Sequence, residues 1–345
     1  MKIDNRKIGK NEPVYIIAEA GVNHNNDLSL AFKMVDVAQN CGADAIKFQT
    51  FKANKIQLPN SVKPGYQKNT KKNYFDLIKS LETSFKDQTK IFNYCKKKKI
   101  TFLSTPYDED SLHFLAKLGV TAFKISSSDL TNHIFLKEVL KKKKLIILST
   151  GISSIKEVDE TLNLISKYNM KNKLILVQTT SDYPAPNEDV NLRVLLEYSK
   201  HYDVITGFSD HTKDDTASLG AVALGAKLVE KHFTLNRKLS GPDQSSSLEP
   251  MELKIWIKKI RILEKSLGVS KKFITPSEKN NQTMRKIIVI HPVQKGTKIT
   301  LKHLSAMRGK PSGILPLESN INKILGKELR RNITETREFS WNMIK

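Results

Sequence analysis

The sequence contains few cysteines, few arginines for so basic a chain, and no long hydrophobic run. Only two of its 345 residues are cysteine, Cys41 and Cys95, which excludes a disulfide framework, and no CxxC pair marks a zinc site. No apolar stretch approaches the ~18 residues that a transmembrane helix requires. The first residues are polar and lack the apolar segment and cleavage site of a signal peptide. We therefore expect a cytoplasmic, globular protein that does not enter a membrane.

Acidic residues are scarce relative to basic ones. Lys and Arg number 58 against 35 Asp and Glu, which gives a net charge of +23, yet only nine of the 58 are arginine. Arginine is the better reader of phosphates and bases, and the lysines gather in helix-like stretches such as 96–99 and 141–144. This pattern favours a solvated lysine face over a nucleic-acid surface, and it is compatible with an anionic small substrate.

Short apolar runs alternate with helix-length segments along most of the chain. The runs are rich in β-branched residues, as in strands buried on both faces, and span 14–21, 45–50, 100–106, 122–127, 145–150, 174–180, 203–210 and 228–234. Between them apolar residues recur at helical spacing, and Asp27 and Asp108 stand where helix caps belong. Eight such units over ~250 residues predict an α/β fold of the (β/α)₈ TIM-barrel type, with a doubly wound sheet as the alternative.

The composition changes after residue 268. Residues 269–284 are polar and read as a linker. Short alternating runs and a Pro/Gly-rich segment then predict a small β-rich domain over 285–345, after a catalytic barrel over 1–268. A domain of that size buries only a small hydrophobic core, so we expect it to pack against the surface of a partner.

Polar residues end the predicted strands one after another. In a barrel these ends meet at one mouth, where the active site is built. They include the following residues: Glu19, Lys47, Gln49, Thr105, Lys124, Ser127, Ser149, Ser181, Tyr183, Ser209, His211, Glu230 and His232. Lys47 and Lys124 lie inside apolar strands, where lysine is rare. Two such lysines beside several Ser and Thr ends suit a phosphate and a carboxylate bound together.

Two histidines and two glutamates allow more than one interpretation. His211 and His232 end adjacent predicted strands and are positioned to share a metal, or are simply hydrogen-bonded histidines. Glu19 and Glu230 become neighbours when the barrel closes, and fit either acid/base carboxylates or buried ion pairs with the lysines.

In their order, these motifs resemble the sialic acid synthase family, which includes N-acetylneuraminate, N,N'-diacetyllegionaminate and pseudaminate synthases. The motifs are IAEAGVNHN, IKFQT, FLSTP, FKISSSD, ILSTG, SDYPAP, GFSDHT, EKHFT and SGPDQSSSLEP. The resemblance covers essentially the whole chain, and its C-terminal part resembles the antifreeze-like (SAF) domain of that family. It implies a transferase that condenses phosphoenolpyruvate with an N-acetylmannosamine-type sugar, using a divalent metal, typically manganese, with Mg²⁺ or Co²⁺ as alternatives.

The resemblance also implies roles for individual residues. His211 and His232 match the metal ligands, Glu19 and Glu230 the active-site carboxylates, and Tyr183 and Asp243 positions near the sugar. The phosphoenolpyruvate contacts are matched by Lys47, Gln49, Thr105, Lys124, Ser127, Ser149, Ser181 and Ser209, although position 181 is Asn in the sialic acid branch. Dimers of this family exchange domains. The resemblance therefore implies that Arg308 enters the barrel of the partner subunit, with Lys310 as the alternative residue.

The sequence allows two interpretations of the sugar substrate. The whole-family resemblance implies an N-acetylneuraminate synthase-like enzyme, while IKFQTFKA, SDYPAP and GPDQSSSLEP resemble the legionaminate branch, whose sugar is 2,4-diacetamido-2,4,6-trideoxymannose. A pseudaminate synthase fits less well. Two other classes are a metal hydrolase, which would need further ligands at HxH-type spacings that are absent, and a non-enzymatic binding module, which would not retain a complete set of mouth residues.

Overall fold

The computed structural model describes residues 1–59, 73–279 and 283–345. It divides the chain into two compact units, Met1–Gly268 and Val269–Lys345, and each is described by itself. Within the described residues no helix is both long and apolar enough to cross a membrane.

The first unit is built on eight parallel strands, confirming the predicted barrel. Their order in the sheet is β5-β4-β3-β10-β9-β8-β7-β6, and β5 and β6 contact each other to close the ring. Every strand lies within one of the eight apolar runs predicted from the sequence. The strands are β3 (Tyr15–Gly21), β4 (Ala45–Thr50), β5 (Thr101–Pro106), β6 (Ala122–Ile125), β7 (Leu145–Ser149), β8 (Leu174–Thr179), β9 (Ile205–Asp210) and β10 (Leu228–His232).

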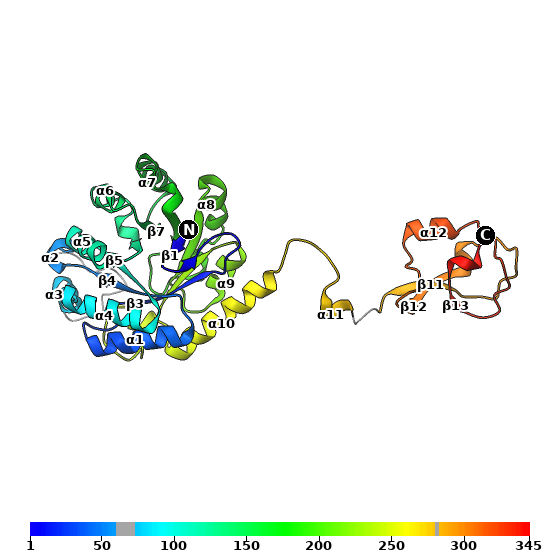
Figure 1. Cartoon of the computed structure of the whole chain (residues 1–345), viewed down its shortest axis with the longest axis horizontal. Helices are drawn as coiled ribbons and strands as arrows, with labels where there is room; N and C mark the ends of the chain where they lie inside the picture. Colours follow the sequence, from blue (N-terminus) through cyan, green and yellow to red (C-terminus); the bar gives the residue numbers. More distant parts are fainter. Residues whose placement is uncertain (60–72, 280–282) are drawn as a thin grey trace. The chain divides into compact units, whose positions relative to one another are not determined.

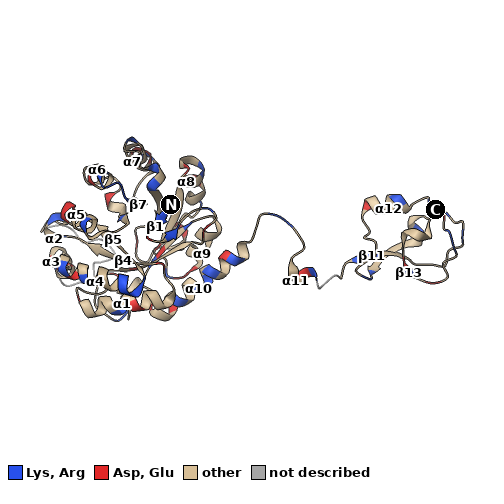
Figure 2. Ribbon diagram, in the orientation of Figure 1, with Lys and Arg blue, Asp and Glu red and all other residues tan. Residues whose placement is uncertain are grey.

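Helices surround the strands (Figure 1). Asp27 and Asp108 cap the first and third of the main helices through their side chains, as predicted. The main helices are α1 (Leu28–Cys41), α4 (Phe85–Lys98), α5 (Glu109–Leu118), α6 (His133–Lys141), α7 (Ile155–Lys167), α8 (Val194–Tyr202), α9 (Thr216–Ala223) and α10 (Pro250–Leu267). Two shorter helices, α2 (Ala53–Ile56) and α3 (Tyr74–Leu81), follow β4. Basic residues lie along the outer helices, for example on α4 and α10 (Figure 2).

Alternation along each strand sorts its side chains between two cores. Outward residues such as Ile16 and Phe123 pack against the helices in the larger core, while inward residues such as Ile17 and Ile147 fill the barrel. A hairpin of β1 (Lys2–Ile3) and β2 (Arg6–Lys7) adds Ile3 to the inner core. The inner core is apolar toward the strands' N-terminal ends, so the inward side chains at the other end are free to be polar.

The second unit contains a three-stranded antiparallel sheet in the order β12-β11-β13. Its strands are β11 (Arg285–Val289), β12 (Leu304–Arg308) and β13 (Arg337–Glu338), with helices α11 (Pro276–Lys279) and α12 (Glu318–Ile324). Its own apolar cluster includes Ile287, Val289 and Phe339. The predicted small β-rich C-terminal domain is therefore present.

Candidate active site

A pocket of about 450 Å³ opens at the carboxyl ends of the barrel strands. We call it the mouth pocket. Its floor consists of the last inward-facing side chains of several strands, which follow apolar inward residues two positions earlier: Glu19 after Ile17, Lys47 after Ala45, and Ser149 after Ile147. The two-residue period of a strand thus places a polar layer directly on the apolar inner core.

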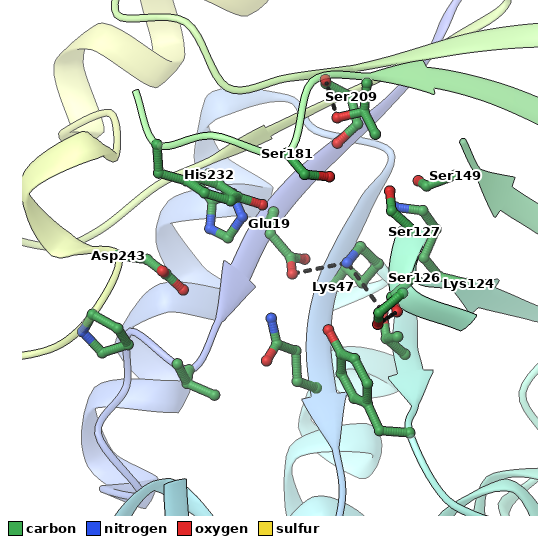
Figure 3. Close-up of a pocket in the computed structure, with 18 of the residues that line it drawn as sticks. Glu19, Lys47, Lys124, Ser126, Ser127, Ser149, Ser181, Ser209, His232 and Asp243 are labelled. Carbon is green, nitrogen blue, oxygen red and sulfur yellow. Dashed lines mark hydrogen bonds and ion pairs between the residues drawn. The ribbon is translucent and has the colours of Figure 1, made fainter. Parts of the chain in front are cut away.

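Two lysines and two glutamates form a buried ion-pair network on this floor, and Figure 3 shows its pair of Glu19 and Lys47. Lys47 Nζ lies 2.8 Å from Glu19 Oε1 and 3.7 Å from Glu230 Oε1, and Lys124 Nζ lies 2.8 Å from Glu230 Oε1. All four side chains are at most 5% exposed. Ser209 donates to the same Glu230 oxygen at 2.9 Å, and Lys47 donates to Thr105 at 3.3 Å.

The network gives the two carboxyl groups different pKa values. Burial raises the pKa of Glu19 to about 7, against the opposing effect of Lys47. Burial also acts to raise the pKa of Glu230, but Lys124 and Lys47 outweigh it and lower that pKa to about 2. Glu230 is therefore a fixed carboxylate, whereas Glu19 is able to gain or lose a proton near neutral pH.

Several buried polar atoms of the floor have no hydrogen-bond partner among the described residues. They are Glu19 Oε2, Glu230 Oε2, Ser149 Oγ and His232 Nδ1. A buried polar atom without a partner costs free energy. These atoms line one pocket and therefore mark it as a place for polar ligand groups.

Small donors gather beside Lys124. The Gly151 backbone N–H donates to Ser127 Oγ at 3.0 Å. A Cβ at Gly151 would lie 2.2 Å from Ser181 Oγ and 2.8 Å from Ser127 Oγ, so a larger residue there would displace both hydroxyls. Ser127, Ser149 and Ser181 thus reach one small volume from the ends of three strands (Figure 3), as an oxyanion or phosphate requires.

His211 follows β9 and His232 ends β10, and the centroids of their rings lie 5.9 Å apart. His211 Nδ1 donates to the Thr180 carbonyl at 2.6 Å, since a carbonyl only accepts. Its Nε2 consequently carries the lone pair and accepts from Tyr183 at 2.9 Å. Burial lowers the pKa of His211 to about 4 and that of His232 well below its ordinary value, so both rings are neutral.

Neutral, buried imidazoles with lone pairs in a polar cavity are suitable metal ligands. His232 Nδ1, which has no hydrogen-bond partner among the described residues, fits that requirement, and His211 Nε2 does so when the Tyr183 hydroxyl moves away from it. In the described part of the chain, no group of three or more His, Cys, Asp or Glu side chains is placed to hold a metal ion. A metal held here would take its other ligands from water or substrate, which is an arrangement of catalytic rather than structural sites.

Asp243 reaches the pocket from the loop after β10 (Figure 3). It is 8% exposed, and burial alone raises its pKa to about 6. Its carboxyl group is available for the hydroxyl or amide groups of a bound ligand.

The structure brings fourteen of the fifteen predicted site residues into the mouth pocket. They are Glu19, Lys47, Gln49, Thr105, Lys124, Ser127, Ser149, Ser181, Tyr183, Ser209, His211, Glu230, His232 and Asp243. Their individual roles remain predictions. Arg308, the fifteenth, ends β12 in the second unit, where its side chain is exposed.

Sequence reasoning missed three features of this region. The backbone N–H of Gly151 carries no side-chain signal, although the STG sequence after β7 is a visible clue. An apolar side of the pocket, which includes Phe51 and Ile78, was hidden because apolar residues outside strands resemble core positions. Buried Lys231 points away from the pocket and pairs with Asp210 at 3.0 Å.

The fold and the site together describe a parallel β/α barrel with two buried lysines at its polar mouth, which is where barrel enzymes build their active sites. Comparisons with known proteins agree. The NeuB family model matches residues 34–272, and the SAF domain model matches residues 285–345. The chain belongs to the NeuB family, and it is a synthase with a C-terminal SAF domain.

Three relatives illustrate the similarity. N,N'-diacetyllegionaminic acid synthase of Campylobacter jejuni is 40% identical over 326 residues, which cover 93% of this chain and 97% of that protein. The synthase of the same name from Legionella pneumophila is 36% identical, with 99% of both chains covered. The crystal structure of N-acetylneuraminic acid synthetase from Leptospira borgpetersenii, in complex with citrate, has a TM-score of 0.73 at 34% identity and covers 81% of this chain and 94% of that one.

Proposed function

We propose that this enzyme condenses phosphoenolpyruvate with an N-acetylated mannosamine-type sugar to give a nine-carbon sugar acid and phosphate. The observation that carries the proposal is the pair of buried lysines, Lys47 and Lys124, beside a cradle of small donors. A trianionic substrate cannot enter a neutral apolar pocket. Family membership supports the same reaction, because synthases of this family act on these two substrate classes.

In this assignment Ser127, Ser149 and Ser181 hold the phosphate with Lys124, the Gly151 N–H orients Ser127, and Lys47 holds the carboxylate. The enol carbon then bonds to the aldehyde carbon of the sugar. Water adds at the former enol-ether carbon, and phosphate leaves from the resulting tetrahedral intermediate. Glu19, with a pKa of about 7, transfers the proton at this centre. Ionised Glu230 orients Lys124 and Ser209.

The charges of the floor support a requirement for further cations. Two lysines face two glutamates, so this network is formally neutral before a trianion enters. A divalent metal on His211 and His232 and one arginine would together supply three positive charges. We assign manganese as the metal, which when bound supplies Lewis-acid polarisation of the sugar aldehyde.

The relatives favour one sugar over another. Two proteins at 40% and 36% identity are named N,N'-diacetyllegionaminic acid synthases. This supports 2,4-diacetamido-2,4,6-trideoxymannose, with N-acetylmannosamine as the second candidate because an N-acetylneuraminic acid synthetase is similar at 34%.

The test is turnover of the purified full-length protein with phosphoenolpyruvate, Mn²⁺ and each of these sugars. We expect phosphate and a nine-carbon acid in equal amounts, no turnover after chelation, and recovery on adding Mn²⁺. Release of phosphate without a sugar-dependent product, or full activity of a His211→Ala, His232→Ala double variant, would contradict the assignment.

A further inference from the structure

The mouth pocket has two chemically different sides. Its polar side comes from the ends of β6 to β9 and contains Lys124 and the serines. Its opposite side is apolar and follows β3 and β4. We call this side the apolar wall; it consists of Val22, Phe51, Ile56, Tyr74, Ile78 and Leu81. Glu19 and Lys47 lie on the floor, on the strands that lead into the wall.

The apolar wall is a preformed surface with its own packing. Its residues belong to a small cluster that is separate from both barrel cores. Val22, Phe51 and Leu81 are at most 5% exposed, which shows that they are backed by other side chains.

Helix α3 presents one face to the pocket. Tyr74, Ile78 and Leu81 occur at i, i+4 and i+7 and line the same cavity. Asn73 caps the helix by accepting from the Phe75 N–H. At the other end, Glu82 accepts from the Ala53 N–H at 3.0 Å and from Lys52 at 3.2 Å, tying α3 to α2.

We propose that the apolar wall selects the sugar by binding the methyl groups at its unreactive end. This inference rests on the proposed function. If phosphoenolpyruvate lies on the polar side and the aldehyde meets it over Glu19, carbons 4 to 6 of the sugar point toward the wall. The class of sugar that fits is deoxygenated and acetylated at this end, a 2,4-diacetamido-2,4,6-trideoxyhexose.

The alternative sugar places hydroxyl groups against the same surface. N-acetylmannosamine carries hydroxyls at carbons 4 and 6 where the diacetamido sugar carries an acetamido group and a methyl. Phe51 and Ile78 have no hydrogen-bonding side-chain atom, so burying hydroxyls against these two residues is unfavourable, whereas burying methyl groups there is favourable. The apolar wall is therefore expected to favour the diacetamido sugar and to disfavour N-acetylmannosamine.

Ile78 provides the test, because it is only half-buried and its loss leaves the cluster's buried members in place. In full-length protein, we expect Ile78→Ser to lower kcat/KM for the diacetamido sugar about tenfold, as for loss of one apolar contact, and to leave the KM for phosphoenolpyruvate within about twofold. For N-acetylmannosamine we expect a change below about threefold, and Ile78→Val should retain most of the preference.

Ile134→Ser is the matched control. It makes the same change on α6, where Ile134 is 81% exposed and does not line the mouth pocket, and we expect no kinetic effect. Thermal melting confirms folding of each variant. Equal losses for both sugars in Ile78→Ser, no loss for either, or a wild-type preference for N-acetylmannosamine would overturn the role of the wall while the synthase function stands. Absence of turnover with both sugars would instead overturn the proposed function, and this inference with it.

Discussion

The buried carboxyl group of Asp243 lowers the stability of the folded state by an amount that depends on pH. Burial raises its pKa from 3.8 to about 6, so the folded state binds the proton more tightly than the unfolded chain. The native state therefore loses stability as pH rises from 3.8 to 6, and the full penalty is present above pH 6.

We expect Asp243→Asn to be more stable than the wild type at pH 8, by about 2–3 kcal/mol, because roughly two pKa units of burial cost are removed. At pH 4 the gain should shrink toward zero, since the wild-type carboxyl group is then largely protonated. Urea unfolding at both pH values checks this. A gain that is the same at both would mean that desolvation of the carboxylate is not its cause.

Ile152 adopts a backbone conformation that β-branched residues rarely occupy. Its φ is +49°, and its side chain is 79% exposed at the rim of the mouth pocket, so no burial offsets the strain. Such conformations cost about 1–3 kcal/mol. Asn tolerates this region, so we expect Ile152→Asn to raise the melting temperature by a few degrees, about 2–4 °C per kcal/mol.

The matched control is Ile155→Asn. Ile155 lies three residues after Ile152, begins helix α7 and is 50% exposed. Asn is a weaker helix former than Ile there, so we expect no gain. Equal shifts in the two variants would show that the backbone of Ile152 is not strained. Loss of turnover in Ile152→Asn alone would show that the strained rim contributes to activity.

At the scale of elements, β10 carries charges on both of its faces. Glu230 and His232 face the pocket, while Lys231 between them faces outward, toward α9. Lys231 pairs with Asp210 of β9 at 3.0 Å and donates to the Thr212 carbonyl at 2.7 Å, and both side chains of the pair are almost fully buried. Asp210 also accepts from Thr212 and Ser218, joining β9 to the start of α9.

We expect Lys231→Met to destabilise the barrel by about 3–5 kcal/mol, because Asp210 is left as a buried charge without its cation. Adding Asp210→Asn should recover much of that loss. The measurement is the free energy of unfolding of the single and double variants. If the double variant loses as much as the sum of the singles, the two residues are not coupled.

The strands themselves were predictable from sequence. Runs such as LIILS in β7 and LILVQT in β8 are buried at every position, and a strand covered on both faces is apolar along most of its length. The lysines inside β4 and β6 were conspicuous for the same reason. Helices α2 and α3 were not anticipated, because they are short and lie in a connection, where apolar residues do not follow a long helical repeat.

At the scale of the molecule, the second unit carries Arg308 on a strand end, exposed within that unit. The family resemblance and the neutral charge of the barrel floor both favour a cation supplied by a partner subunit. We predict that an Arg308→Ala chain and a His211→Ala, His232→Ala chain, each inactive, regain activity when mixed, because one site of each mixed dimer is then intact.

With random exchange, half of the dimers are mixed and half of their sites intact, so we expect about a quarter of wild-type activity. Mixing two preparations of the His211→Ala, His232→Ala chain is the control and should restore nothing. If exchange is verified and the Arg308→Ala mixture also stays inactive, Arg308 acts within its own chain or is the wrong residue. The same experiment with Lys310→Ala then distinguishes these cases.

The sequence by itself determined the barrel, the small C-terminal domain and the polar layer at the strand ends. It did so because strand periodicity and burial act locally: residues two apart share a face, and a doubly covered strand excludes all but apolar side chains and a few functional ones. Ordered motifs such as FKISSSD and EKHFT added the family.

Only the tertiary structure decided how those residues act on one another. The split in pKa between Glu19 and Glu230 depends on which lysine each carboxylate meets across the ring, at distances that no spacing in the chain encodes. The apolar wall likewise arises where loops after β3 and β4 meet. Ile78 and Val22 are 56 positions apart in the sequence and become neighbours in one cluster only when the barrel closes.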